Sequence, residues 1–300
     1  MRFGVTGGAG FVGSNLVKLL VKEGHKVIVI DNLHKGKKEN LLSVIKDIEF
    51  YQIDIRNVKR MEEVLTNVDG VFHQAALTVV QESFTNSKEY HDVNVKGTEN
   101  IFKLAIKNKF KVVFASSSSV YGHKEKTPII ENSERVPINP YGQTKLDDEY
   151  LAEKYSRLGV KINGLRYFNI FGEGQTPEYA GVITKFLEKI EKKESPIIFG
   201  DGSQIRDFIF VEDIVRANLK IMINDVPDLF FNIGTGNSIS ILELAKIMIK
   251  ISGLGGKPEF RAKLEGDIKK SHADISLLKK RFDWKPDVKL ENWLEEIFKK

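Results

Sequence analysis

The sequence predicts an α/β fold, with a doubly wound parallel sheet and a smaller C-terminal lobe. Three observations predict it. Short apolar runs alternate with helical stretches through the first half of the chain, which is typical of a parallel sheet covered by helices on both faces. A glycine-rich turn over Thr6 to Gly13 joins the first apolar run to the first helical stretch. After residue 168 the alternation loosens, because prolines and the stretch FGDGSQIRDF interrupt it.

The expected elements of the first half follow this alternation in order. Strands are expected at Phe3 to Val5, Lys26 to Ile30, Glu49 to Ile53, Gly70 to Gln74, Val112 to Ala115 and Val160 to Tyr167. Helices are expected at Asn15 to Val21, Tyr90 to Lys107 and Tyr141 to about Arg157. Asn139 and Pro140 come just before the third helix, where they serve as its cap and its first-turn proline.

The second half is expected to divide between the two parts of the fold. Short strands are expected at Phe208 to Val211 and Leu229 to Ile233, a helix at Ile241 to Ile251, and a partly helical tail from Leu277 to Phe298 that Pro286 breaks. We therefore expect a sheet domain over residues 1–168 with a returning segment around 208–235. Residues 169–207 and 236–300 are expected to form a ligand-binding lobe.

The composition excludes several classes of site. The 300 residues contain no cysteine, which excludes disulfides, thiolate zinc sites and a cysteine nucleophile. His73, His91 and His123 lack paired metal-ligand spacing, so no metal is expected. No apolar run approaches the roughly 20 residues of a membrane span, and the N-terminus lacks a signal-peptide pattern, so a cytoplasmic protein is expected. The net charge of +5 indicates a lysine-rich surface with a local basic site for an anionic ligand.

The glycine-rich turn predicts a dinucleotide site. Gly8, Gly10 and Gly13 fit the spacing G-x-G-x-x-G between a strand and a helix, where a pyrophosphate can sit on the helix N-terminus. Asp31 follows the second strand, about twenty residues on, which is the context that supports this motif. A carboxylate there binds ribose hydroxyls and repels a 2′-phosphate, so the sequence favours NAD and a Rossmann-like sheet domain. Lys35, Lys37 and Lys38 follow nearby and leave NADP open.

A second group of residues predicts proton transfer beside this site. It comprises the hydroxyl run Ser116 to Ser119, Tyr141 and Lys145. Tyr141 and Lys145 are four residues apart and share one face of the expected helix. A tyrosine is a weak acid, with a reference pKa of about 10, but a nearby ammonium and a positively charged nicotinamide favour the phenolate. Tyr141 could then take a proton from a carbinol while hydride leaves to NAD, with a serine holding the oxygen.

These motifs resemble those of the extended short-chain dehydrogenases/reductases, and among them the NAD-dependent nucleotide-sugar epimerases of the UDP-glucose 4-epimerase type. The resemblance runs nearly end to end. It is carried by TGGAGFVGS, HQAA, SSSSVYG, PYGQTK, LRYFNIFG, GDGSQIRDFIFVED, FNIGTG and GDIKKSHAD. It implies a bound NAD that takes hydride from C4 of a hexose and returns it to the opposite face. It also implies a homodimer formed through the helices around 92–108 and 141–157.

The resemblance implies a role for individual residues. For the cofactor it implies Gly7, Gly10, Phe11, Val12 and Gly13 at the pyrophosphate, Asp31 and Asn32 at the ribose, Asp54 and Ile55 at the adenine, and Ala75, Ala76 and Asn94 along its path, with Tyr141 and Lys145 also binding it. For catalysis it implies Ser117 as the hydroxyl, Tyr141 as the base and Lys145 as its electrostatic partner. For the UDP-sugar substrate it implies Ser117, Asn169, Val182, Phe199, Arg206, Asp267 and Ser271.

Several positions distinguish 4-epimerisation from the other reactions and substrates of related enzymes. Ser118 and Ser119 stand where 4,6-dehydratases carry an Asp-Glu pair, which argues against dehydration, and Ser119 also argues against uronate decarboxylation. A UDP-glucuronate 4-epimerase stays open. Ser271 resembles the epimerases that also accept N-acetylhexosamines. Leu264 replaces a phosphate-binding arginine of many relatives, and Gly174 stands where relatives often have another arginine.

An alternative of another class is a non-catalytic NAD-binding module, regulatory or RNA-binding. The retained serine, tyrosine and lysine argue against it, and the chain lacks the clustered arginines and aromatics of a nucleic-acid platform. No nucleic-acid or membrane partner is therefore expected.

Overall fold

A seven-stranded parallel sheet forms the centre of the molecule, as the sequence predicted. The computed structural model describes residues 1–175 and 181–299. The strand order is β11-β6-β5-β4-β1-β2-β3, and every neighbouring pair is parallel. The strands are β1 (Arg2–Thr6), β2 (Lys26–Asp31), β3 (Ile48–Gln52), β4 (Gly70–His73), β5 (Lys111–Ser117), β6 (Ile162–Tyr167) and β11 (Phe230–Ile233).

The direction of winding reverses between β1 and β4. From β1 the chain builds outward through β2 and β3, and it then crosses to β4 and builds the other way. In open parallel sheets, ligands bind at such a switch point, outside the carboxyl ends of the strands. The glycine-rich turn follows β1 at that edge.

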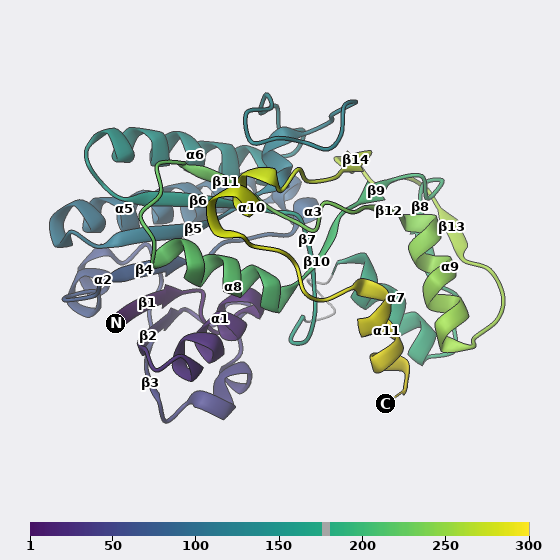
Figure 1. Ribbon diagram of the computed structural model, residues 1–300, viewed down its shortest axis with the longest axis horizontal. Coiled ribbons are helices and arrows are strands. Elements are labelled where there is room, and N and C mark those ends of the chain that lie inside the picture. The colour runs from purple at the N-terminus through teal and green to yellow at the C-terminus, as the bar shows by residue number, and fades with distance from the viewer. Residues whose placement is uncertain (176–180, 300) are drawn as a thin grey trace.

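Helices cover both faces of the sheet (Figure 1). One face packs against α1 (Phe11–Lys22), α8 (Val211–Met222) and α10 (Ser276–Phe282), and the other against α2 (Val58–Val64), α5 (Gly97–Asn108) and α6 (Pro140–Arg157). Buried apolar side chains of the strands and these helices form the two main cores, one on each face.

A third apolar core lies in the lobe at the right of Figure 1. Phe171, Phe210 and Trp293 pack ring against ring at its centre, with centroids 5.1 to 6.2 Å apart. Three helices surround it: α7 (Val182–Glu191), α9 (Ile241–Ser252) and α11 (Leu290–Lys299). The short strands of this half are β7 (Asn169–Phe171), β8 (Ile197–Phe199), β9 (Ile205–Arg206), β10 (Phe208–Phe210), β12 (Ile239–Ser240), β13 (Glu259–Arg261) and β14 (Lys270–Ser271).

Two helices differ from the sequence expectation. Helix α1 begins at Phe11 rather than Asn15, because Gly10 is its N-cap and the glycine-rich turn already belongs to its first turn. The single helix expected over Tyr90 to Lys107 is divided into α4 (Ser87–Tyr90), a π-helical segment (His91–Lys96) and α5. Helices also occur where none was expected, namely α2, α3 (Val80–Thr85), α7, α8 and 3₁₀ turns at Lys38–Val44 and Ser118–Tyr121.

Candidate active site

The turn after β1 is shaped by close backbone contacts that only glycine permits. A Cβ on Gly13 would lie 2.1 Å from the carbonyl oxygen of Gly7, and Gly7 itself has φ +65° and a backbone contact at Ala75. The Gly10 N–H donates to the Gly7 carbonyl over 3.1 Å, and helix α1 follows at once. The turn therefore presents the N-terminus of α1 to the carboxyl edge of the sheet, in the geometry that receives a pyrophosphate.

Two cavities meet at this turn. The larger, of about 380 Å³, is lined by all five residues predicted for the pyrophosphate. The smaller, of about 180 Å³, is lined by Asp31, Asn32, Asp54, Ile55, Ala75 and Ala76. Gly7, Gly10, Lys35, Gln74 and Ala76 line both. The residues predicted for the two ends of a dinucleotide therefore line adjoining spaces.

Asp31 also organises the turn itself. One carboxylate oxygen accepts the Ala9 N–H at 2.9 Å, and the other accepts the Leu33 N–H at 2.8 Å. Burial raises the pKa of Asp31, while these two N–H donors oppose that effect. Gly36 lies against the same carboxylate, where a Cβ would come within 2.8 Å. The acid expected to hold ribose hydroxyls thus also fixes the glycine-rich turn.

The residues predicted for the adenine include a carboxylate that is held in place, Asp54. Arg56 donates to both oxygens of Asp54 at 2.8 and 2.9 Å, and the Asn32 side chain donates at 3.0 Å. These contacts, Arg56 first, lower the pKa of Asp54 to about 2. Gly97 of α5 packs on Ile55 so closely that a Cβ would lie 2.4 Å from Ile55 Cδ1.

Replacing Gly13 with alanine is expected to remove bound NAD, because the added Cβ would displace the Gly7 carbonyl and open the turn. The measurement is the amount of NAD released by denaturing the purified protein, quantified by chromatography. Gly24→Ala is the control for backbone strain without a steric clash, since Gly24 lies beyond the other end of α1, has φ +77° and has nothing within 4 Å of an added Cβ. A Gly13→Ala protein with full NAD content would refute this function of the turn.

The predicted catalytic residues line the larger cavity together. Ser117 ends β5, while Tyr141 and Lys145 lie on the first turns of α6. The Asn139 side chain accepts the Gly142 N–H at 2.7 Å and Pro140 begins the helix, so the expected cap is confirmed. The Ser83 hydroxyl accepts the Tyr141 N–H at 3.1 Å. The Asn139 cap and the Ser83 hydrogen bond together fix the start of α6 beside the larger cavity.

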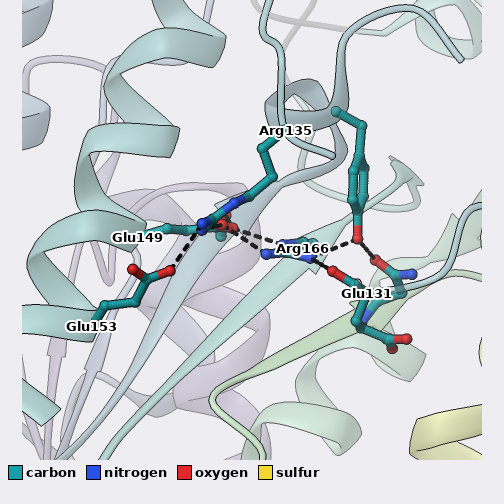
Figure 2. Close-up of polar contacts among 8 residues, drawn as sticks. Glu131, Arg135, Glu149, Glu153 and Arg166 are labelled. Carbon is teal, nitrogen blue, oxygen red and sulfur yellow. Dashed lines mark hydrogen bonds and ion pairs between the residues drawn. The ribbon is translucent and has the colours of Figure 1, made fainter. Parts of the chain in front are cut away.

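A buried ionic cluster joins α6 to the serine run (Figure 2). Glu149 of α6 accepts two hydrogen bonds from Arg166 of β6, each at 2.8 Å, and one from Arg135 at 2.9 Å. Its Oε1 also accepts the Ser116 hydroxyl at 2.6 Å. Arg166 also donates hydrogen bonds to the Tyr121 hydroxyl and the Glu131 backbone carbonyl. Glu149 therefore ties the end of β5 to the helix that carries Tyr141.

The predicted substrate residues fall into two groups. Asn169 and Val182 line the larger cavity with Ser117. Phe199, Arg206, Asp267 and Ser271 are not among its lining residues. Arg206 is instead paired with Asp267 at 2.5 Å, and Gln204 links Asp267 to the Phe199 carbonyl. Ser271, buried on β14, lies with its hydroxyl 3.5 Å from that of Ser118.

Asn94, predicted to lie along the cofactor path, contacts the segment that follows β4. Its side chain exchanges hydrogen bonds with both backbone groups of Leu77, at 2.8 and 2.9 Å, and donates to Thr144 at 3.0 Å. It lines neither cavity. Its place in the π-helical segment aims the amide at Leu77, so it fixes the segment after β4 that borders the smaller cavity.

A polar group on the cavity wall, Gln74, has no predicted role, although it stands where relatives usually have an apolar residue. Gln74 lines both cavities, and its side chain bonds to Tyr167 at 3.1 Å and Asn218 at 3.2 Å. Burial raises the pKa of Tyr167, so its phenol stays neutral. The available signal was a polar residue at the end of an apolar strand, next to Ala75 and Ala76.

Neither a metal centre nor a membrane span is found in the described part of the chain. Among residues 1–175 and 181–299, no group of three or more histidine or acidic side chains could hold a metal ion. None of the helices in the same ranges is long and apolar enough to cross a bilayer.

Comparison with known proteins gives consistent matches. A model of the NAD-dependent epimerase/dehydratase family matches residues 4–234. A protein of Methanocaldococcus jannaschii, named as a candidate UDP-glucose 4-epimerase, is 39% identical over 298 residues, covering 98% of this chain and 96% of the relative.

Solved structures are similar over almost the whole length. The UDP-glucose 4-epimerase of Thermotoga maritima with UDP-glucose superimposes with a TM-score of 0.94 at 36% identity, covering 100% of this chain and 98% of the other. The UDP-N-acetylglucosamine 4-epimerase of Methanobrevibacter ruminantium, in complex with UDP-N-acetylmuramic acid, gives a TM-score of 0.92 at 37% identity, covering 99% and 97%.

Proposed function

This chain belongs to the NAD-dependent epimerase/dehydratase family, and on that premise we propose that it interconverts UDP-glucose and UDP-galactose by 4-epimerisation. Its cofactor is NAD. The observation that carries the proposal is the shared cavity of Ser117, Tyr141 and Lys145, which begins at the glycine-rich turn. Ser118 and Ser119 follow in place of the acid pair that elimination needs, which favours epimerisation over dehydration.

The residues present fit NAD. The Gly7–Gly13 contact leaves room for backbone to approach a pyrophosphate, and the smaller cavity offers Asp31 and the fixed Asp54–Asn32 pair to a nucleoside. When bound, NAD accepts hydride from the sugar and returns it.

The protein's own residues move the matching proton. We assign to Tyr141 the removal of the proton from the C4 hydroxyl and its return after the keto-sugar has turned. Ser117 holds the same oxygen by a hydrogen bond, which keeps it within reach of the phenol. The Lys145 ammonium favours the phenolate form of Tyr141 by its positive charge. The proton lost in the first half-reaction is regained in the second, so the cycle needs no outside base.

A dimer through α5 and α6 forms part of the proposal. Tyr150 on α6 is 50% exposed and Ile106 on α5 is 44% exposed. Large apolar side chains on two adjacent helices suit burial against a second copy.

The test is incubation of the purified protein, without added NAD, with UDP-galactose, UDP-GalNAc and UDP-glucuronate in separate reactions, followed by NMR. Conversion of UDP-galactose to its 4-epimer supports the proposal. Conversion of UDP-glucuronate alone would replace it with a uronate 4-epimerase. An NAD-containing protein that converts none of the three would favour the non-catalytic alternative.

We expect Ser271→Tyr to narrow the substrate range. The hydroxyl of Ser271 lies beside Ser118, so a phenol ring there would occupy space next to the serine run. The ratio of UDP-GalNAc to UDP-galactose turnover should fall about tenfold or more, the range typical of pocket-size discrimination. Ser271→Ala is the matched control and should keep the ratio, because it adds no bulk. An unchanged ratio in Ser271→Tyr would remove Ser271 from the determinants of specificity.

A further inference from the structure

A buried carboxylate lies directly on the lysine of the site. Asp148 is completely buried on α6, and its Oδ2 lies 3.2 Å from the Lys145 ammonium nitrogen. Lys145 is itself only 4% exposed. Tyr141, Lys145 and Asp148 are spaced by four and three residues, so they follow one face of the helix. The proposed function assigns Asp148 no role.

Two other titratable side chains lie near Lys145 and Asp148, namely His73 and Asp147. His73 of β4 lies between Thr6 and Thr98, with ring nitrogens 2.7 and 2.9 Å from their hydroxyls. Burial, assisted by the Lys145 charge, lowers the pKa of His73 to about 3, so its ring is neutral. Asp147, the neighbour on α6, is partly exposed and accepts a hydrogen bond from Gln143. Among the described residues, Asp148 is the only carboxylate within 4 Å of the ammonium.

The protonation state of Asp148 changes with pH near neutrality. Burial raises the pKa of Asp148 to about 7, even though the Lys145 charge and hydrogen bonds from Lys145 and Thr98 oppose that effect. Its Oδ1 is buried and accepts no hydrogen bond from the described residues, which penalises the ionised form. Below neutral pH the carboxyl is therefore protonated, and above it the group becomes a carboxylate.

We propose that Asp148 is a positioning residue that sets how strongly Lys145 favours the phenolate form of Tyr141, an inference that rests on the proposed role of Tyr141 as the base. With Asp148 protonated, the ammonium charge acts undiminished on the phenol. With Asp148 ionised, the pair is neutral and the phenolate is favoured less. Ionisation of Asp148 thus opposes ionisation of Tyr141, and the rise of activity with pH is spread over a wider range than one ionisation gives.

The test compares the pH dependence of kcat for the wild type, Asp148→Asn and Asp147→Asn. Asparagine has the shape of the protonated carboxyl and cannot ionise. In Asp148→Asn the acidic limb of the kcat–pH profile should shift to lower pH by about one unit, the lower end of the pKa shifts caused by close charges. The limb should also become steeper, with the slope of a single ionisation. Asp147→Asn removes the same charge from the adjacent position and should leave the limb in place. Asp148→Ser, smaller and also neutral, should shift it in the same direction if asparagine does not fit.

A second readout separates this inference from the proposed function. The tyrosinate absorbance of each protein is titrated and compared with that of its Tyr141→Phe counterpart, which isolates the ionisation of Tyr141. A fully active Tyr141→Phe enzyme would overturn the proposed function. If Tyr141→Phe is inactive but the acidic limb of Asp148→Asn stays in place or moves to higher pH, the proposed function stands and only the role of Asp148 is overturned. Equal shifts in Asp147→Asn and Asp148→Asn would overturn it too, because the effect would then not depend on contact with Lys145.

Discussion

Tyr141→Phe is expected to lower kcat for UDP-galactose by about 10²- to 10⁴-fold, the usual contribution of a general base. The substitution removes the oxygen that takes the proton and leaves the ring in place. The backbone N–H of residue 141 still donates to Ser83, and the Asn139 cap is untouched. The unfolding temperature should therefore match that of the wild type, and the protein should still contain NAD, because the glycine-rich turn that would hold the pyrophosphate is unchanged.

The measurement is kcat and KM by a coupled assay, with NAD content determined on the same preparation. Tyr150→Phe is the matched control, since Tyr150 lies nine residues further along α6 and is half exposed. Wild-type kcat in Tyr150→Phe would tie the loss to position 141. A Tyr141→Phe enzyme that retained more than a tenth of the activity would require another base.

Glu149→Ala is expected to reduce the free energy of unfolding by about 3–5 kcal/mol, the cost of leaving one partner of a buried ion pair uncompensated. Arg166 is almost fully buried and would lose both of its hydrogen bonds to Glu149. The Ser116 hydroxyl would lose its acceptor as well. Urea unfolding followed by circular dichroism measures the change.

Glu153→Ala provides the control for this substitution. Glu153 pairs with the same Arg135 at 2.9 Å, but its side chain is 28% exposed. Removal of such a partly exposed pair is expected to cost less than about 1 kcal/mol. If Glu149→Ala and Glu153→Ala lost equal free energies of unfolding, burial of Arg166 would not explain the contribution of Glu149 to stability.

The sheet and the glycine-rich turn were predictable because their signals are local. Strand runs, the G-x-G-x-x-G spacing and the Asn139–Pro140 cap each depend on neighbouring residues, and the observed β1, β2 and α6 lie within one or two residues of expectation. The start of α1 was placed late because glycine has low helix propensity, although Gly10 caps the helix and Gly13 lies inside its first turn.

The buried contacts were not predictable in the same way. The bonds of Asn94 to Leu77 and of Glu149 to Arg166 join residues 17 positions apart, and nothing in either segment names its partner. The π-helical segment at residues 91–96 contains Asn94, whose contact with Leu77 is tertiary and leaves no local signal. Arg166, a charge in a strand of otherwise apolar and neutral residues, was the one local signal that a buried partner was required.

The separate apolar core of the lobe has a consequence for how this enzyme can diversify. One wall of the larger cavity, formed by Val182, Ile183 and Phe208, belongs to the apolar core around Phe171, Phe210 and Trp293 and not to the two cores that hold the sheet together. Substitutions that reshape that wall are therefore absorbed within the lobe, and the dinucleotide half keeps its geometry. Selection for a new sugar can act on one half of the molecule while the redox half is inherited unchanged.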